Sequence, residues 1–144
     1  MSKALVAYFS ASGVTAKVAE KLARSISADL NWMDKKSRST VEMNDRSCRP
    51  AIGSRVENMA QYDTVFVGFP IWWYREPSII DTFMESYDFA GKTVIPFATS
   101  GGSGLGDSAK NMQGLARGAK VAEGKRFSGS ASESDLAGWA KKWL

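Results

Sequence analysis

The sequence predicts an α/β protein whose parallel sheet is covered by helices on both faces. Apolar runs that fit buried strands alternate along the chain with segments of helical periodicity, as in proteins built from strand–helix–strand units. The strand-like runs are apolar nearly throughout, which is typical of strands buried on both faces of a sheet. Loops rich in hydroxyl groups, aromatic rings or glycine follow three of these runs, where such sheets bind ligands.

The first part of the chain predicts one clear strand and one clear helix. The apolar run 4–9 predicts the first strand. Apolar residues then recur at every fourth position and predict one helix face: Val14, Val18, Leu22 and Ile26. Between residues 29 and 63 the pattern is weak, so we expect at best a short strand at 28–33. Ile52, Val56 and Met59 hint at a further helix.

The remaining elements are predicted more sharply. Strands are expected at 64–69 and 93–98, with Pro96 as a mild conflict, and a last strand at 120–127, weakened by Gly124. Pro77 fits the first turn of a helix, and Ser132 fits the N-cap of the final helix. The apolar faces of the three helices are Ile79, Ile80, Phe83, Met84 and Tyr87; Ala109, Met112, Leu115 and Ala116; and Leu136, Trp139, Ala140 and Trp143.

Composition limits the chemistry open to the protein. The chain has 144 residues, 44% hydrophobic and 24% charged, so we expect one globular domain over residues 1–144. It contains no histidine and a single cysteine, Cys48, which excludes a histidine-based triad and an intrachain disulfide. We therefore expect no catalytic side chain and no metal site, and we expect any redox chemistry to belong to an organic cofactor.

Charge and hydropathy bear on location and partners. No apolar run is long enough to cross a bilayer and no charged-then-apolar leader precedes Lys3, so we expect a cytoplasmic protein with no membrane partner. The formal net charge is +4. A solvated basic surface is the simplest interpretation, and affinity for an anionic ligand or an acidic partner is the alternative. Nucleic acid is disfavoured as a partner because the basic residues are dispersed and no nucleic-acid motif accompanies them.

The loop 10–15 has the composition of a phosphate site. Its hydroxyl side chains and one glycine stand where a strand gives way to a helix N-terminus. Backbone N–H groups and the positive end of the helix dipole favour an anion there, and hydroxyls add donors without adding charge. The loop contains no lysine or arginine.

Two further loops would face the same edge of the sheet. The loop 70–77 contains Trp72, Trp73 and Tyr74, which cannot all face one core because they are consecutive. A flat ligand could stack on them, or they could cap the sheet edge or contact another subunit. The loop 99–106 has four glycines, which allow the backbone to approach a ring closely, although a flexible turn would have the same composition. The P-loop and dinucleotide motifs are absent, so one phosphate and one flat ring fit best.

In this order, the three loops resemble those of the flavodoxins. The chain is similar to the branch of that family with Pro-Ile-Trp-Trp and Ala-Thr-Ser-Gly-Gly-Ser-Gly loops, which stand here at 70–73 and 98–104. The resemblance covers the first strand and helix, then 62–108, and less specifically the C-terminal helix. It implies a flavodoxin-like three-layer sandwich, a parallel sheet of order 2-1-3-4-5, and non-covalent FMN as the redox group.

The resemblance also implies a role for each loop. The first loop would hold the FMN phosphate, the second would flank the isoalloxazine ring, and backbone groups of the third would contact the ring edge. The implied cofactor-binding residues are Ser10, Ser12, Gly13, Val14 and Thr15; Pro70, Ile71, Trp72, Trp73 and Tyr74; and Thr99, Ser100, Gly101, Gly102, Ser103 and Gly104. Arg75 and Glu76, beside the aromatic loop, are expected to be solvated rather than to contact a substrate.

Two features depart from the family pattern. Flavodoxins that carry low-potential electrons are usually acidic, whereas this chain is basic, and a basic surround favours the anionic reduced flavin and raises its potential. The chain is also shorter around 29–32 than its relatives, so we expect the edge strand there to be short or missing. An open edge invites pairing, which makes a homodimer one expected assembly.

Three functions are compatible with these observations. The first is an FMN-binding flavoprotein in electron transfer or an NAD(P)H-dependent oxidoreductase, working with a redox partner protein or a small acceptor such as a quinone. The second is a flavin-free flavodoxin-like binding module, because one fold hosts many functions. The third, a nucleic-acid-binding accessory protein, is suggested by charge alone.

Overall fold

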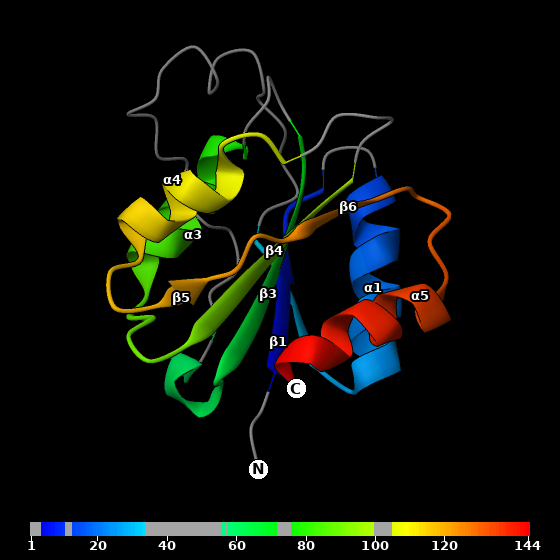
Figure 1. Cartoon of the computed structure of the whole chain (residues 1–144), viewed down its shortest axis with the longest axis horizontal. Coiled ribbons are helices and arrows are strands. Elements are labelled where there is room, and N and C mark those ends of the chain that lie inside the picture. Colours follow the sequence, from blue (N-terminus) through cyan, green and yellow to red (C-terminus); the bar gives the residue numbers. More distant parts are fainter. Residues whose placement is uncertain (1–3, 11–12, 34–55, 57, 72–75, 100–104) are drawn as a thin grey trace.

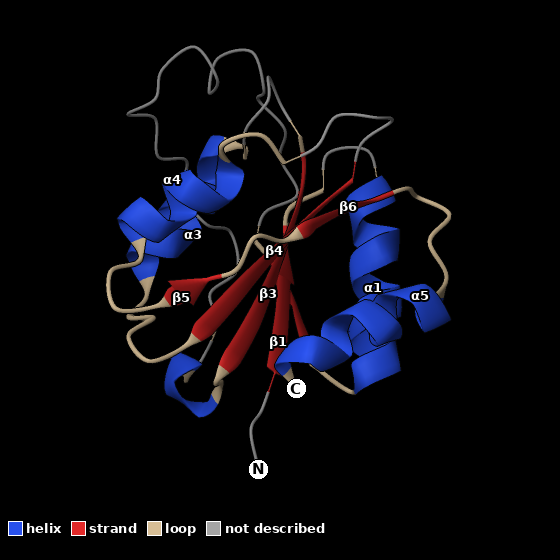
Figure 2. Cartoon of the chain, in the orientation of Figure 1, coloured by secondary structure: helices blue, strands red, loops and turns tan. Residues whose placement is uncertain are grey.

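A parallel β-sheet forms the middle layer of the molecule (Figure 1, Figure 2). The computed structural model describes residues 4–10, 13–33, 56, 58–71, 76–99 and 105–144. The sheet order is β2-β1-β3-β4-β5, with β6 also paired to β4, which confirms the predicted order. The strands are β1 (Ala4–Tyr8), β2 (Asp29–Trp32), β3 (Thr64–Pro70), β4 (Thr93–Thr99), β5 (Lys120–Val121) and β6 (Lys125–Phe127).

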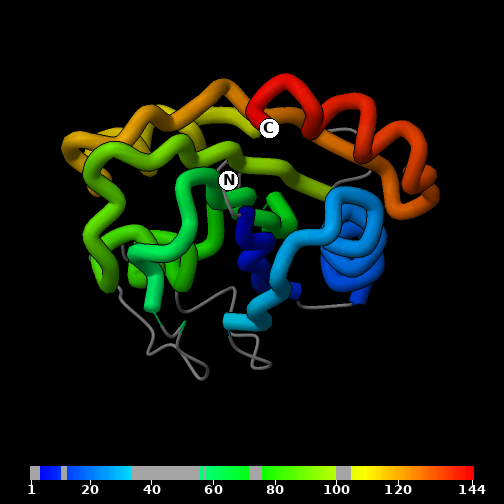
Figure 3. The backbone as a smooth tube through the Cα atoms, turned by 90° about the horizontal axis from the view of Figure 1, so that it is seen from below, coloured from blue at the N-terminus to red at the C-terminus, as the bar shows by residue number. Residues whose placement is uncertain are grey.

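Helices cover both faces of the sheet and complete the three layers. In Figure 1, α1 (Val14–Ile26) and α5 (Glu133–Ala140) lie on one side, and α3 (Ser78–Ser86) and α4 (Ser108–Leu115) lie on the other. Figure 3 looks nearly along α1 and shows α5 beside it. Short 3₁₀ turns at Met59–Gln61 and Lys141–Trp143 complete the described elements.

The core is two apolar layers separated by the sheet. On one face, Leu22 of α1 and Trp139 of α5 belong to the same buried cluster as Phe66. On the other face, Ile80 of α3 and Met112 of α4 join Val65. Because each central strand contributes to both clusters, its residues are apolar without alternation, as the sequence indicates.

The buried face of α1 differs from the predicted one at its start. Val18 and Leu22 are buried, but Val14 is 41% exposed. A four-residue spacing is longer than one helical turn, so the predicted line of residues drifts around the helix. The buried residues are Thr15, Ala16, Val18, Ala19, Leu22 and Ala23.

The edge strand β2 is short, as predicted. It pairs with β1 over four register positions, and Leu30 on it is 43% exposed. The Tyr62 hydroxyl donates to Asp29 Oδ2 at 2.6 Å, and the ring of Trp32 stacks on Tyr8 with centroids 5.7 Å apart. These contacts hold an edge that has few backbone partners. Of the helix hinted at by Ile52, Val56 and Met59, Ile52 lies outside the described residues, and only the single turn at Met59–Gln61 is seen.

The last strand is divided, so the prediction of one strand over 120–127 was wrong. β5 and β6 pair with the two ends of β4 on either side of Pro96, which has no N–H to offer the ladder. Gly124 lies in the break with a φ of +80°, and a Cβ there would approach the Pro96 carbonyl oxygen to 2.3 Å. Pro96 in β4 and Gly124 opposite it therefore mark the same break in the pairing between β4 and the last strand.

The helix starts follow the sequence closely. Ser132 is the N-cap of α5, and its Oγ accepts the Asp135 backbone N–H at 3.1 Å, as predicted. Pro77 was predicted to lie in the first turn of α3. It is instead the N-cap, immediately before the first helical residue, Ser78.

Candidate functional site

The carboxyl ends of the central strands meet the N-terminus of α1 at one edge of the sheet, the upper end in Figure 1. Tyr8 at the end of β1 is in register with Gly68, and Pro70 is in register with Thr99. The loops that follow β1, β3 and β4 therefore leave the sheet side by side. This is the edge at which open α/β sheets bind ligands.

The structure describes part of the predicted site. Seven of the predicted residues are described: Ser10, Gly13, Val14, Thr15, Pro70, Ile71 and Thr99. The others lie outside the described residues: Ser12, Trp72, Trp73, Tyr74, Ser100, Gly101, Gly102, Ser103 and Gly104. The geometry below therefore concerns the first loop and the bases of the other two.

The first loop is closed by a hydrogen bond across its ends. The Gly13 N–H donates to Ser10 Oγ at 3.0 Å, and Ser10 is only 3% exposed. Gly13 has φ +92° and ψ −9°, the left-handed conformation that glycine adopts without strain. A Cβ built at Gly13 would meet nothing within 4 Å, so backbone conformation rather than space requires the glycine there.

Among the described residues, no acceptor competes for the first backbone N–H groups of α1. Gly13 is its N-cap, no side chain caps it, and its first turn contains no acidic residue. The first helical bond observed runs from Lys17 N to Gly13 O, so the N–H groups of residues 14–16 have no acceptor within the helix. Amides without an acceptor in the helix and the positive end of a 13-residue helix make an environment that suits an anion.

A buried pair of hydroxyls joins the first loop to the third. Thr15 Oγ1 lies 2.6 Å from Thr99 Oγ1, and the two residues are 2% and 4% exposed. Thr15 is the second residue of α1 and Thr99 is the last residue of β4. The two residues are 84 positions apart in sequence, and no local pattern predicts their contact.

The base of the second loop lies against the same strand end. The Ile71 N–H donates to the Thr99 carbonyl oxygen at 3.4 Å, which extends the pairing of β3 with β4 by one residue. Thr99 is also in register with Phe127 of β6 on its other side. Its backbone is thus held between two neighbouring strands.

Glu76 is a structural residue that the sequence prediction misplaced. We expected it to be solvated, but it is fully buried, and Asn111 Nδ2 donates to its Oε1 at 2.8 Å. Glu76 lies two residues before α3 and Asn111 lies in α4, so the bond joins the end of the aromatic loop to the helix that follows the glycine-rich loop. Arg75 lies outside the described residues. A charged residue beside a proline gives no local signal of burial, because its partner is distant in sequence.

Tyr8 lies where β1 reaches the site. Its burial, and to a smaller extent the nearby Glu20 carboxylate, raise the pKa of its hydroxyl above the ordinary value. Tyr8 therefore remains neutral throughout the physiological range and adds no charge near the first loop.

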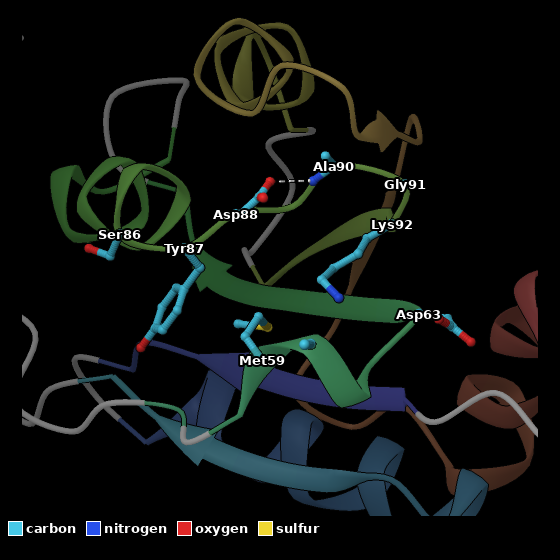
Figure 4. A pocket seen from close by; sticks show the side chains of 9 residues that line it. Met59, Asp63, Ser86, Tyr87, Asp88, Ala90, Gly91 and Lys92 are labelled. Carbon is cyan, nitrogen blue, oxygen red and sulfur yellow. Dashed lines mark hydrogen bonds between the residues drawn. The ribbon is translucent and has the colours of Figure 1, made fainter.

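A pocket lies at the opposite, amino-terminal edge of the sheet (Figure 4). It has a volume of about 590 Å³ and is lined by residues from the 3₁₀ turn at 59–61, the end of α3 and the loop before β4. Asp63, Asp88 and Lys92 line it together, so both signs of charge are present. That mixture does not favour a phosphate, and no part of the predicted site lies there.

The described residues contain no helix that is both long and apolar enough to span a bilayer. They also contain no group of three or more histidine, cysteine, aspartate or glutamate residues placed to hold a metal ion.

Comparison with known proteins identifies the family. The model of the Flavodoxin family matches residues 3–143, so the chain belongs to that family. No curated protein sequence matches the chain.

Solved structures agree in fold. The chain is similar to a protein assigned as a flavoprotein from Bacteroides eggerthii DSM 20697, with 42% identity, a TM-score of 0.89, and coverage of 99% of this chain and 98% of that one. A second such protein, from Bacteroides uniformis ATCC 8492, has 43% identity, a TM-score of 0.86, and coverage of 97% and 98%. A flavoprotein from Lactobacillus acidophilus NCFM, solved in complex with FMN, has 21% identity, a TM-score of 0.75, and coverage of 99% of both chains. This last likeness concerns the fold alone.

Proposed function

We propose that this flavodoxin-family protein binds FMN at the carboxyl ends of β1, β3 and β4, and that it works in electron transfer or as an NAD(P)H-dependent oxidoreductase. The observation that carries the proposal is the uncapped N-terminus of α1, which begins at a left-handed Gly13 beside the ends of the central strands. The relative from Lactobacillus acidophilus, which shares the fold and was solved with FMN, supports the same ligand.

The donors at this site fit a phosphate group. A phosphate monoester accepts hydrogen bonds and donates few, and the described residues of the first loop present backbone N–H groups and two hydroxyls. Ser10 uses an acceptor lone pair for Gly13, which leaves its own proton for a ligand. No acidic side chain in the first turn of α1 would repel the anion.

Each loop has a distinct part in the proposal. FMN, when bound, supplies the one- or two-electron redox chemistry. Ser10, Ser12, Gly13, Val14 and Thr15 would hold its phosphate. Pro70 and Ile71 would begin the wall beside the ring, which Trp72, Trp73 and Tyr74 would continue, and residues 99–104 would face the ring edge. No protein side chain is required to move a proton for simple electron transfer.

An absorbance spectrum of the purified protein tests the proposal. We expect flavin bands in the visible range, either as purified or after FMN is added to the apoprotein and the excess is removed. Riboflavin, which lacks the phosphate, is the matched control and is expected to bind more weakly. A folded protein that retains no FMN would contradict the proposal and favour the flavin-free binding module.

The two flavin-dependent roles are separated by a turnover assay. Low-potential flavodoxin shuttles usually have an acidic surface, whereas this chain has a net charge of +4. A positive charge attracts an anionic electron donor such as NAD(P)H, so it favours the oxidoreductase over the shuttle. We therefore expect the FMN-loaded protein to oxidise NAD(P)H in the presence of a quinone. Absence of turnover in a protein that binds FMN would instead support a shuttle that works with a redox partner protein.

A further inference from the structure

We infer that Thr99 is a positioning residue for the phosphate rather than only a contact to the ring edge. In this inference its hydroxyl donates to Thr15 and thereby leaves the Thr15 proton for a phosphate oxygen. The inference rests on the proposed FMN site. It gives the end of β4 a part in recognising the phosphate of the ligand as well as its ring.

The first step is the contact itself. The two Oγ1 atoms are 2.6 Å apart, which is a short distance for a hydrogen bond between neutral hydroxyls. Both residues are nearly inaccessible, at 2% and 4% exposed, so bulk water does not compete for the bond. Among the described residues, each of these hydroxyls has the other as its hydrogen-bond partner.

The second step is a count of protons. Each hydroxyl has one proton to donate and can accept at two lone pairs. If Thr15 donated to Thr99, Thr15 would turn only lone pairs toward an anion, which would be repulsive. If Thr99 donates to Thr15, Thr15 keeps its proton for a phosphate oxygen and is polarised by the bond that it accepts. A bound phosphate therefore selects the arrangement in which Thr99 is the donor.

The third step is the rigidity of Thr99. Its backbone is in register with Pro70 on one side and Phe127 on the other, and its carbonyl accepts the Ile71 N–H. Its hydroxyl therefore stands on a fixed strand end, whereas Thr15 stands on the first turn of a helix. Both hydroxyls thus stand on regular elements, which hold a binding group more precisely than loops do.

Binding measurements on the apoprotein test the inference. The variants are Thr99→Val, which removes the hydroxyl at similar shape, and Thr99→Ser, which keeps it. Thr93→Val at the other end of the same strand is the matched control. The dissociation constants for FMN and for riboflavin are measured by quenching of flavin fluorescence, after circular dichroism shows that each variant is folded.

We expect Thr99→Val to weaken FMN binding about tenfold, which corresponds to about 1.4 kcal/mol, and to weaken riboflavin binding much less. Thr99→Ser and Thr93→Val are expected to bind both flavins like the wild type. In a Thr15→Val background, Thr99→Val should have no further effect on FMN, because it acts through the Thr15 hydroxyl.

The other outcomes are equally decisive. Equal weakening of both flavins would place the effect at the ring or in the strand and overturn the inference, as would additive effects of the two Val substitutions. If the wild type binds FMN but Thr99→Val has the same ratio of FMN to riboflavin dissociation constants as the wild type, the inference is overturned and the proposed function stands. A wild type that binds neither flavin would overturn the proposed function, and the inference with it.

Discussion

Gly13 sets the direction of the backbone amides at the start of α1. Its φ of +92° is one that an L side chain adopts at a cost of about 1–2 kcal/mol. The open space around it means that no steric clash adds to this cost. A substitution at Gly13 therefore tests the effect of backbone conformation on the proposed phosphate site, without a steric clash.

Gly13→Ala is expected to destabilise the fold by about 1 kcal/mol and to weaken FMN binding, because the first-turn amides lose their preferred direction. Urea denaturation of the apoprotein and flavin titration measure the two effects. Gly138→Ala is the matched control, because Gly138 lies within α5 with open space around its Cα, where alanine is favoured by about 0.5–1 kcal/mol. Unchanged stability and binding in Gly13→Ala would contradict the expectation.

Tyr62 contacts the edge strand β2 through a hydrogen bond from its hydroxyl to Asp29. Burial of Tyr62, followed by its hydrogen bond to Asp29 and the charge of that carboxylate, raises its pKa from 10.0 to about 12. The unfolded chain thus loses this proton near pH 10, while the folded chain retains it. Folding stability from this residue is fully present below pH 10 and falls as the pH rises toward 12.

Tyr62→Phe removes this titration, so its free energy of unfolding should fall less steeply than that of the wild type between about pH 10 and 12. Asp29→Asn should give an intermediate slope, because burial of Tyr62 remains while the carboxylate charge is lost. Urea denaturation at several pH values measures the slopes, and the groups common to all three proteins contribute equally to them. Parallel curves for wild type and Tyr62→Phe would refute this assignment.

At the scale of elements, a side-chain hydrogen bond joins the segment just before α3 to α4. The buried Glu76 carboxyl accepts from Asn111, and Glu76 stands between the aromatic loop and α3. Burying a carboxyl group is costly unless donors compensate it, so this bond is needed where it lies. It also connects the chain segments that follow β3 and β4.

Asn111→Ala is expected to lower the free energy of unfolding by about 1–3 kcal/mol, because the buried Glu76 loses a donor. Chemical denaturation measures this loss. Lys110→Ala, an exposed substitution on the same helix, is the control and should change stability by less than about 0.5 kcal/mol. A loss in Asn111→Ala no larger than that of the control would show that other groups satisfy Glu76.

At the scale of the whole molecule, a ligand that binds only the folded chain must raise its stability. FMN at about one hundred times its dissociation constant should add about 2.7 kcal/mol. For a protein of this size, that corresponds to a rise in Tm of roughly 5–10 °C. Riboflavin at the same concentration should give a smaller rise. Thermal denaturation measures both, and an unchanged Tm with FMN would argue against the proposed site.

The distribution of charge predicts how salt affects the protein. The net charge is +4, but the sequence places no lysine or arginine within the loop 10–15. Dipoles and hydroxyls at short range are screened little by salt, whereas a docking surface for an acidic partner is screened strongly. FMN binding should therefore change less than about threefold between about 0.1 and 1 M salt. A steep loss of affinity would show that distant cations hold the phosphate.

Local pattern was sufficient for most of the fold. Continuous apolar runs marked β1, β3 and β4, because strands covered on both faces have no polar side. Apolar periodicity marked α3 and α5, and Ser132 marked a helix start through a bond to its own neighbour, Asp135. The alternation of strands and helices then left few parallel topologies open. These features depend on residues near one another in the chain, so the sequence contains them directly.

The features missed depend on residues that meet from distant parts of the chain. The division of the last strand follows from Pro96 lying opposite Gly124, and the burial of Glu76 follows from Asn111. The pairing of Thr15 with Thr99 joins residues 84 positions apart. The sequence alone predicts a phosphate site from the hydroxyl residues, the glycine and the helix start of the loop 10–15. Which of these hydroxyls meet is decided by the folded backbone, because a hydrogen bond needs two groups brought within about 3 Å of each other.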